Sequence, residues 1–460
     1  MISKLPMDRE PINLQGGWPT PRLHPVEAMR SATLDLFARD DIHELLKYGP
    51  EHGDNSMRSN LGAWLSSSYC PQAGSISADR IVVTNGASNG LAVILQKFAD
   101  VSVTRNIWMV EPAYFLACPV FRDAGFGGSI RGVPEGPDGI DLAYFESALN
   151  CAARDESPPP SRHSKTPKKG YSKIYRHVLY MVPTNSNPSG RTMSLPQRER
   201  LIRLARQYDV LIITDDVYDL LHWPSQQSGS EGKARLMPRM VDVDRSLEGT
   251  NEFGNAVSNG SFSKIVAPGV RVGWLESMPA FVRAMGTVGA TVSGGCQAHL
   301  SSLIMNQMLS NGAVTRHIAD VLIPTYSRRY NTMVSAIRRL LLPLGVKIMA
   351  DPQDPTRTSE DLAGGFFLYI IFPQDGLLPP AEEIAKFALD EYSLRVAPGK
   401  MFMATDEDLG RQRSSGQYLS GARLCWAWHE EDALEEGVQR LGEVLKHFYR
   451  QISPAKAIEM

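Results

Sequence analysis

The sequence predicts an α/β protein with two parts: a large domain whose mostly parallel sheet lies between helices, and a smaller α+β domain. Three observations support this prediction. Short apolar runs alternate with amphipathic helical patterns through the middle of the chain, which is typical of βαβ units. Near Tyr326 the pattern changes to a long helix, a strand-like run and two further helices. The chain of 460 residues also exceeds what one hydrophobic core usually holds.

Six short apolar runs are the predicted strands of the large domain. They lie at 80–84, 107–110, 178–182, 210–214, 256–259 and 272–275. Between them, the stretch 195–208 places apolar residues among charges, as an amphipathic helix does. Ligands of parallel sheets bind at the carboxyl ends of the strands, so the residues after each strand are the first candidates for a site.

The domain boundaries follow from these patterns. We expect residues 1–50 to form an N-terminal arm that joins the smaller domain, 51–325 the large domain, and 326–460 the smaller one. The smaller domain is predicted to contain helices at 328–342, 381–392 and 431–449 and a strand at 366–372. Two polar segments, 154–173 and 225–235, are predicted surface insertions, and a basic docking loop is the alternative for the first.

Charge and composition exclude several classes of protein. The formal net charge is −2, which argues against a general nucleic-acid or membrane-surface binder. No apolar run approaches the ~18 residues of a membrane helix, and the N-terminus has no signal-peptide pattern. The 5 cysteines show no CxxC pairing and the 10 histidines no metal-ligand spacing. We therefore expect a cytoplasmic protein with reduced thiols and without a metal, nucleic-acid or membrane partner.

The strongest chemical signal is Ser261-Phe262-Ser263-Lys264, followed by Pro268-Gly269-Val270-Arg271-Val272-Gly273-Trp274. A lysine in this apolar-leaning setting can lose its proton and become nucleophilic. The arginine and the two serines supply donors for a phosphate. Alone, the first motif is also typical of a surface turn. With the second motif, it resembles the cofactor-lysine signature of fold-type-I pyridoxal-phosphate (PLP) enzymes, in particular class I/II aminotransferases.

This resemblance implies a fold-type-I PLP-transferase architecture with PLP as the cofactor. Lys264 would hold PLP as an aldimine and then act as the catalytic acid and base. Asp215 would face the ring nitrogen, and Asn187 and Tyr218 the phenolic oxygen, which completes the expected catalytic set. The residues expected to bind the cofactor are Tyr48, Ala87, Ser88, Asn89, Tyr114, Asn187, Asp215, Tyr218, Ser261, Ser263, Lys264 and Arg271.

Other strand ends carry motifs in the order of that family. The turn Thr84-Asn85-Gly86-Ala87-Ser88-Asn89-Gly90-Leu91 opens a helix, where backbone amides favour a phosphate. Glu111-Pro112-Ala113-Tyr114 would stack its tyrosine on the pyridine ring, although a packed core tyrosine is the simpler interpretation of this motif alone. Asn187-Pro188-Ser189-Gly190 resembles the NPTG box but is also a good turn. In Asp215-Asp216-Val217-Tyr218, we interpret Asp216 as structural.

The resemblance also extends to substrate and subunit contacts. Arg423, in Ala422-Arg423-Leu424-Cys425-Trp426, is expected to hold the substrate carboxylate by two parallel hydrogen bonds, with Gly17 and Asn187 beside it. Tyr48 is expected to reach the phosphate of a partner subunit. The sequence departs from the family where Ser420-Gly421-Ala422 replaces an expected asparagine, and where Trp426 and Trp428 replace smaller residues.

We therefore expect a homodimeric PLP-dependent aminotransferase that moves an amino group between an L-amino acid and a 2-oxo acid by a ping-pong mechanism. The motif spacing resembles the kynurenine/α-aminoadipate aminotransferase branch. One alternative is an enzyme of the same fold that performs elimination, γ-replacement or cyclopropane-forming (ACC-synthase-like) chemistry. Further alternatives are a transcription-regulator-type domain and a catalytically inactive binding protein.

Overall fold

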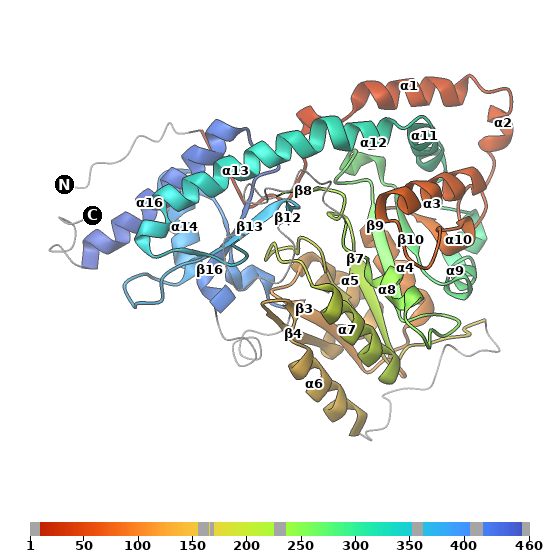
Figure 1. Cartoon of the computed structure of the whole chain (residues 1–460), viewed down its shortest axis with the longest axis horizontal. Helices are drawn as coiled ribbons and strands as arrows, with labels where there is room; N and C mark the ends of the chain where they lie inside the picture. The colour runs from red at the N-terminus through yellow and green to blue at the C-terminus, as the bar shows by residue number, and fades with distance from the viewer. Residues whose placement is uncertain are drawn as a thin grey trace.

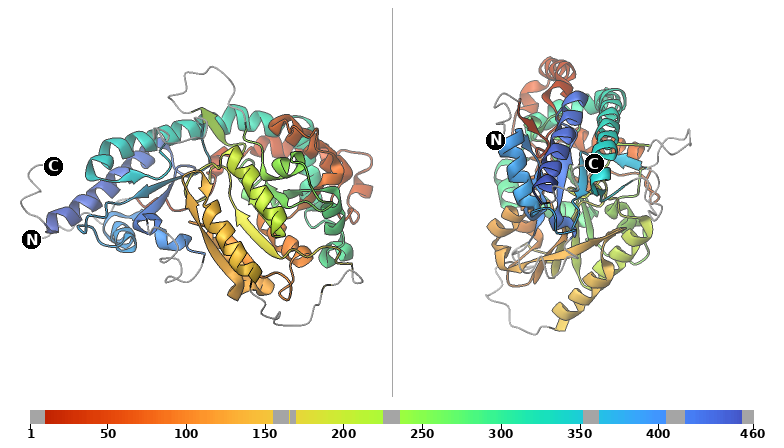
Figure 2. Two further views of the ribbon diagram at one scale, coloured as in Figure 1. Left: turned by 60° about the horizontal axis from the view of Figure 1, so that its bottom comes forward. Right: turned by 90° about the vertical axis from the view of Figure 1, so that its left-hand side faces the viewer.

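The computed structural model describes residues 10–154, 165, 170–224, 236–351, 362–404 and 417–452. The predicted insertion 225–235 and most of 154–173 lie outside these residues. The described chain is elongated, with an eight-stranded sheet toward one end and a four-stranded sheet toward the other (Figures 1 and 2). Within the described ranges, no helix is both long and apolar enough to cross a membrane.

The eight-stranded sheet has the order β2-β10-β9-β7-β6-β3-β4-β5. Neighbouring strands from β9 to β4 are parallel, whereas β10 is antiparallel to β2 and β9, and β5 to β4. The strands are β2 (Ile81–Thr84), β3 (Asn106–Glu111), β4 (Ile130–Gly136), β5 (Gly139–Ile140), β6 (His177–Met181), β7 (Val210–Asp215), β9 (Ala256–Ser261) and β10 (Gly273–Glu276). The predicted fold class, a mostly parallel sheet flanked by helices, is confirmed.

Helices cover both faces of this sheet. Along β7, Leu211 and Ile213 belong to the core beneath α4, α5 and α9, whereas Val210 and Ile212 belong to the core beneath α6, α7 and α8. Successive strand side chains point to opposite faces, so a strand buried on both sides must be apolar throughout. These helices are α4 (Ala87–Phe98), α5 (Cys118–Phe121), α6 (Leu142–Arg154), α7 (Leu195–Gln207), α8 (Met240–Ser246) and α9 (Pro279–Met285).

A second group of helices lies beside the β2 edge of the sheet. Helix α1 packs along α11, and α3 packs on α11 and β2 (Figure 1). The helices are α1 (Val26–Phe37), α2 (Ile42–Leu45), α3 (Asn55–Tyr69), α10 (Gly289–Gly294), α11 (His299–Ser310) and α12 (Ala313–His317).

The smaller sheet has the order β11-β13-β16-β15 and is antiparallel. Its strands are β11 (Lys347–Ile348), β13 (Phe367–Ile371), β15 (Ala397–Pro398) and β16 (Gly421–Cys425), and its helices are α13 (Ile323–Leu340), α14 (Ala381–Tyr392) and α16 (Glu431–Ile452). The expected boundary at residue 325 falls inside α13, which runs between the two ends of the molecule in Figure 1. The division into domains stays a prediction.

Two short strand pairs connect distant parts of the chain. β1 (Ile12–Asn13) lies parallel to β14 (Leu394–Arg395), so residues near the N-terminus run beside the C-terminal region. β8 (His222–Pro224) lies antiparallel to β12 (Leu362–Gly364) and joins the end of the β7 region to the start of β13. Both pairs therefore attach the smaller sheet to segments that reach the carboxyl ends of the large sheet.

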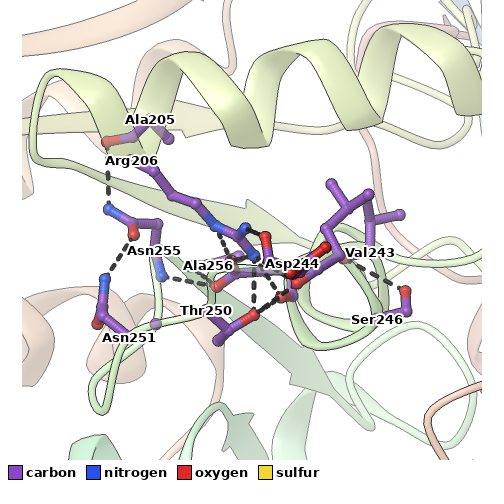
Figure 3. Close-up of polar contacts among 12 residues, drawn as sticks. Ala205, Arg206, Val243, Asp244, Ser246, Thr250, Asn251, Asn255 and Ala256 are labelled. Atoms are coloured by element: carbon purple, nitrogen blue, oxygen red, sulfur yellow. Dashed lines mark hydrogen bonds and ion pairs between the residues drawn. The ribbon is translucent and has the colours of Figure 1, made fainter.

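A buried polar cluster fixes the starts of β7 and β9 (Figure 3). Asp244 of α8 accepts from Nη2 of Arg206 on α7 at 2.9 Å, and its other oxygen accepts from the backbone N–H of Asn255 at 2.6 Å. The Asn255 amide donates to the Val210 carbonyl at 2.9 Å. Because both strands are held at their starts, the positions of their far ends, where the polar motifs lie, are also constrained.

Asp244→Ala is therefore expected to destabilise the fold strongly. The change removes the charged partner of the largely buried Arg206 guanidinium, which keeps only neutral acceptors, and leaves two buried backbone N–H groups without their acceptor. Breaking such a pair should lower the free energy of unfolding by about 3 kcal/mol, measured by chemical denaturation. The exposed Arg203–Glu199 pair on α7 is the control, and Glu199→Ala should cost less than about 1 kcal/mol. Equal losses from the two variants would contradict the role of the buried cluster.

Candidate active site

A cavity of about 390 Å³ lies between the carboxyl ends of the large-sheet strands and the smaller sheet. Most of the residues predicted from the sequence line it: Gly17, Ala87, Ser88, Tyr114, Asn187, Asp215, Tyr218, Ser261, Ser263, Lys264, Arg271 and Arg423. Tyr48 and Asn89 do not line it. The fold therefore brings together residues as far apart in the sequence as Gly17 and Arg423, and most of them lie at strand ends, as expected.

Lys264 follows β9 and reaches into the cavity. Its Nζ donates to the carbonyl of Gly17 at 2.8 Å and lies near the rings of Tyr218 and Phe366. Burial lowers the pKa of Lys264 to about 8, against the opposing effects of Cys425 and Asp215. A lysine with this pKa is neutral in a substantial fraction of molecules near physiological pH, so its amine can act as a nucleophile or a base.

Asp215 is the last residue of β7 and lines the cavity floor. One carboxylate oxygen accepts from the hydroxyl of Tyr180 at 2.7 Å, and the other is buried without a hydrogen-bond partner. Burial raises the pKa of Asp215 to about 6, while the bond from Tyr180 opposes that rise. A buried acceptor without a donor is costly unless a ligand supplies one. The site is therefore suited to a ligand with a protonated ring nitrogen.

Asp216 points away from the cavity. Its carboxylate accepts from the hydroxyls of Thr214 at 2.8 Å and Ser258 at 2.5 Å. Ser258 in turn lies 3.4 Å from a guanidinium nitrogen of Arg239. These contacts tie β7 to β9, which is what the structural interpretation of Asp216 predicts.

The opposite end of the cavity is built for an anion. Helix α4 begins there at Ala87, preceded by Gly86 with a φ of +86°, a conformation that L side chains rarely adopt. Its free backbone N–H groups favour a phosphate. Arg271 donates to the Asn85 carbonyl at 3.0 Å and to Ser263 Oγ at 3.4 Å, which holds its guanidinium beside Ser88 and Ser261 at this end of the cavity.

Asn89 has a different position from the one expected. Its side-chain oxygen accepts from the backbone N–H of Asn85 at 3.1 Å, and its amide donates to Gln297. These bonds stabilise the turn into α4. Asn89 thus shapes the anion-binding turn and does not itself line the cavity.

Arg423 of β16 closes the side that faces the smaller sheet. It donates to the amide oxygen of Asn187 at 2.6 Å and to the carbonyl of Gln15 at 2.5 Å. Its guanidinium lies 4.0 Å from the centre of the Phe367 ring. Because the Asn187 oxygen is already engaged, the Asn187 amide group is left to donate into the cavity.

Two tyrosines complete the walls. Tyr218 is buried and packs against Phe366 and Phe367, with ring centroids 5.4 and 5.8 Å apart. Burial raises the pKa of Tyr114 to about 12, so that phenol stays protonated at neutral pH. Both hydroxyls are therefore available as hydrogen-bond donors.

Several lining residues were not predicted from the sequence. Tyr180 is an interior residue of β6, where an aromatic side chain is usually a core residue. Asn259 lies within β9, and an asparagine inside an otherwise buried strand is a signal that could have found it. Its amide donates to the Ala87 carbonyl at 2.9 Å, and its buried oxygen has no hydrogen-bond partner. Gln15 and Arg395 lie in segments that come together only through the β1–β14 pairing.

The most direct test of the buried amine is a stability measurement on the cofactor-free protein. Lys264→Met is expected to raise the free energy of unfolding at pH 7 by up to about 3 kcal/mol, because a pKa of about 8 makes the buried ammonium costly. The unfolded chain binds more protons than the folded chain between pH 8 and 10.5, so wild-type stability should rise with pH there. The advantage of the variant should disappear by pH 10.5.

Lys347→Met, at an exposed position on β11, is the control and should give no gain at either pH. Chemical denaturation of the three proteins at pH 7 and pH 10.5 makes the comparison. A pH-independent gain for Lys264→Met would show that packing, and not charge, is responsible.

Comparison with protein families gives one clear match. The family model described as "Aminotransferase class I and II" matches residues 10–441. An uncharacterized protein of Saccharomyces cerevisiae is 36% identical over 96% of this chain and 98% of its own length. Aromatic-amino-acid aminotransferase 1 of Thermococcus litoralis is 27% identical over 97% of this chain and 90% of its own.

Solved structures show the same fold. The kynurenine aminotransferase of Pyrococcus horikoshii superposes with a TM-score of 0.72 over 97% of this chain and 92% of that one, at 24% identity. The α-aminoadipate aminotransferase of Thermus thermophilus, solved with N-(5'-phosphopyridoxyl)-L-leucine, gives a TM-score of 0.70 over 96% and 94%, at 23% identity. The resemblance to class I/II aminotransferases drawn from the motifs is thus confirmed by the family model, and the solved structures share the fold.

Proposed function

The chain belongs to the class I and II aminotransferases, and from this premise we propose that Lys264, Asp215 and Arg423 are the centre of its active site. The reaction is PLP-dependent transfer of an amino group between an amino acid and a 2-oxo acid. No observation favours elimination, γ-replacement or a regulatory role. The observation that carries the assignment is one cavity that holds a partly neutral lysine, a carboxylate oxygen lacking a donor, and a buried arginine.

The residues present fit PLP. The unpartnered oxygen of Asp215 would hold the protonated ring nitrogen, and Tyr218 and the Asn187 amide would donate to the phenolic oxygen. Tyr114 would cover the ring, and Ala87, Ser88, Ser261, Ser263 and Arg271 would hold the phosphate. When bound, PLP supplies a ring that accepts electrons and so stabilises negative charge on the substrate Cα.

The protein's own groups perform the remaining work. Arg423 binds the substrate carboxylate, exchanging its bond with the Gln15 carbonyl for two parallel bonds to the ligand. The Nζ of Lys264, neutral in part because of burial, accepts a proton from the substrate Cα and later returns one. Asp215 keeps its charge at neutral pH, since its pKa of about 6 is below 7. Tyr180 stabilises that charge by donating to it.

The cavity walls indicate the kind of side chain that the substrate carries. Trp18, Phe115, Leu116 and Val120 are apolar residues of the cavity wall. Such a wall suits an aromatic or large aliphatic amino acid. We therefore include these amino acids among the substrates of the site.

The proposed roles predict both the labelled residue and the reaction. Cofactor-free protein mixed with PLP and then reduced with borohydride should carry the label on the peptide containing Lys264, identified by mass spectrometry. The rate of capture should rise with pH around a midpoint near 8, because only the neutral amine attacks an aldehyde. PLP-loaded protein given one amino acid at a time should then release the matching 2-oxo acid.

Asp215→Asn keeps the shape of the side chain and removes its charge. We expect PLP to bind, and the half-reaction to slow by at least about 100-fold. Label on a lysine other than Lys264, or an Asp215→Asn variant within twofold of wild type, would contradict the assignment.

We also propose that two copies of the chain form the functional enzyme. Several large apolar side chains are exposed around α1, α2, α10 and α11: Val26, Leu34, Phe37, Leu46, Val292 and Leu300. These elements meet one another, since His299 of α11 lies 2.8 Å from the Leu45 carbonyl at the end of α2. Such a patch is typical of a protein–protein interface. Tyr48 lies in the same region and is 90% exposed, in keeping with a role in a partner's site.

Mixed dimers test the role of Tyr48. If Tyr48 acts across the interface, a hybrid of Tyr48→Phe with Arg271→Ala collects both defects in one site and keeps about half of wild-type activity. A hybrid of wild type with the Tyr48→Phe, Arg271→Ala double variant then has one defect in each site and should be far less active. The reverse ranking would place Tyr48 in the site of its own chain, and an active monomer would exclude a shared site.

A cytoplasmic location is the last part of the proposal. All five cysteines are free thiols, and Cys70 and Cys151 are exposed. Exposed free thiols are typical of proteins kept in a reducing compartment.

A further inference from the structure

One of the arginines that line the cavity has no anionic partner in the proposed function. Among the described lining residues, the cationic groups are Lys264, Arg271, Arg395 and Arg423, and the one carboxylate is Asp215. In the proposed function, Arg271 meets the cofactor phosphate, Arg423 meets the substrate carboxylate, and Lys264 acts in the chemistry. Asp215 faces the ring nitrogen. Arg395 therefore remains uncompensated when a substrate with one carboxylate is bound.

The backbone of Arg395 is firmly held. It is the second residue of β14, opposite Asn13 of β1, and its carbonyl accepts from the Leu14 N–H at 2.9 Å. Its neighbour Leu394 is fully buried, while the Arg395 side chain is exposed on the other side of the strand. In the described parts of the chain, no hydrogen bond or ion pair engages its guanidinium. The donors of Arg395 are thus free, on a fixed backbone.

The pairing of the strands brings Arg395 to the cavity that Arg423 also lines. Ala397 of β15 is the partner of Arg423 in β16, and Arg395 lies two residues before Ala397. Leu14 connects the two segments, because its N–H donates to the Arg395 carbonyl at 2.9 Å and its carbonyl accepts from the Cys425 N–H at 2.8 Å. Both arginine side chains line the same cavity.

We infer that Arg395 determines specificity by binding the second carboxylate of a dicarboxylic substrate, an inference that rests on the proposed role of Arg423. Two guanidinium groups that line one cavity suit a short carbon chain with an acid group at each end. Guanidinium–carboxylate bonds are directional and can be bidentate, so the second contact adds selectivity as well as attraction. Because the Arg395 side chain is exposed, it stays hydrated when the ligand has no second acid group.

The test uses PLP-loaded enzyme and two unreactive probes, glutarate and butyrate, which differ by one carboxylate. Dissociation constants are measured by calorimetry at low salt. We expect wild type to bind glutarate at least about tenfold more tightly than butyrate, and added salt to reduce this preference. Arg395→Gln should weaken glutarate binding at least about tenfold more than butyrate binding. Arg395→Lys, which keeps the charge, should restore part of the preference.

Kinetics supply a second measurement. For Arg395→Gln, kcat/KM with 2-oxoglutarate should fall through KM, and fall at least about tenfold more than kcat/KM with phenylpyruvate. Lys347→Gln is the control, because it removes one positive charge from an exposed position on β11, outside the cavity. It should leave kcat/KM for both 2-oxo acids, and the dissociation constants of glutarate and butyrate, within twofold of the wild-type values. The inference would be overturned if Arg395→Gln weakened glutarate and butyrate binding equally, or changed neither.

These experiments distinguish failure of the proposed function from failure of the proposed role of Arg395. Wild-type enzyme that produces no 2-oxo acid from any amino acid would refute the proposed function, whatever glutarate does. Normal transamination together with an unchanged glutarate preference in Arg395→Gln would refute the role of Arg395 alone.

Discussion

Two opposite charges buried at neighbouring strand ends determine the chemistry of this cavity. Burial raises the pKa of Asp215 to about 6 and lowers that of Lys264 to about 8, and each group opposes the shift of the other. The carboxylate therefore stays mostly charged at neutral pH, while a minor fraction of the amine is neutral. In water the carboxylate would be fully charged and the amine almost entirely protonated. The neutral fraction of Lys264 thus depends on the exclusion of solvent from the carboxyl ends of β7 and β9.

A second layer of buried charges supports these strand ends. Arg239 forms ion pairs with Asp242 at 3.0 Å and with Glu276 of β10 at 2.6 Å, and its guanidinium lies 4.0 Å from the centre of the Tyr69 ring. Through Ser258 the same arginine reaches Asp216, next to Asp215. Such networks stabilise little relative to apolar packing, but removing one member is costly, so they tolerate few alternative arrangements. Strands β7, β9 and β10 are thereby held in one register beside the cavity.

The strands and cavity residues that could be predicted from the sequence are those that a local pattern of residues marks. The six large-sheet strands were recognisable because both faces of each are buried, and most of the cavity residues were recognisable because they follow those strands. β4 was missed because Gly132 and Pro134 interrupt its pattern. Tyr180 could not be found in this way, since a tyrosine on a buried strand has the same pattern whether it packs or donates. The place of Arg395 beside the cavity depends on the long-range pairing of β1 with β14 and of β15 with β16, which no local pattern contains.

The segment from Gln15 to Gly17 lies across both reactive cations. The Gly17 carbonyl accepts from Lys264, and the Gln15 carbonyl accepts from Arg423. These two carbonyl oxygens occupy acceptor positions that the oxygens of a bound ligand would take. A ligand that reaches Arg423 exchanges one acceptor for another, and its net gain is only the difference between the two bonds. The binding affinity of a ligand at Arg423 consequently depends on the position of the segment from Gln15 to Gly17 as well as on the ligand itself. A substitution that shifts this segment should therefore change ligand affinity without touching the ligand.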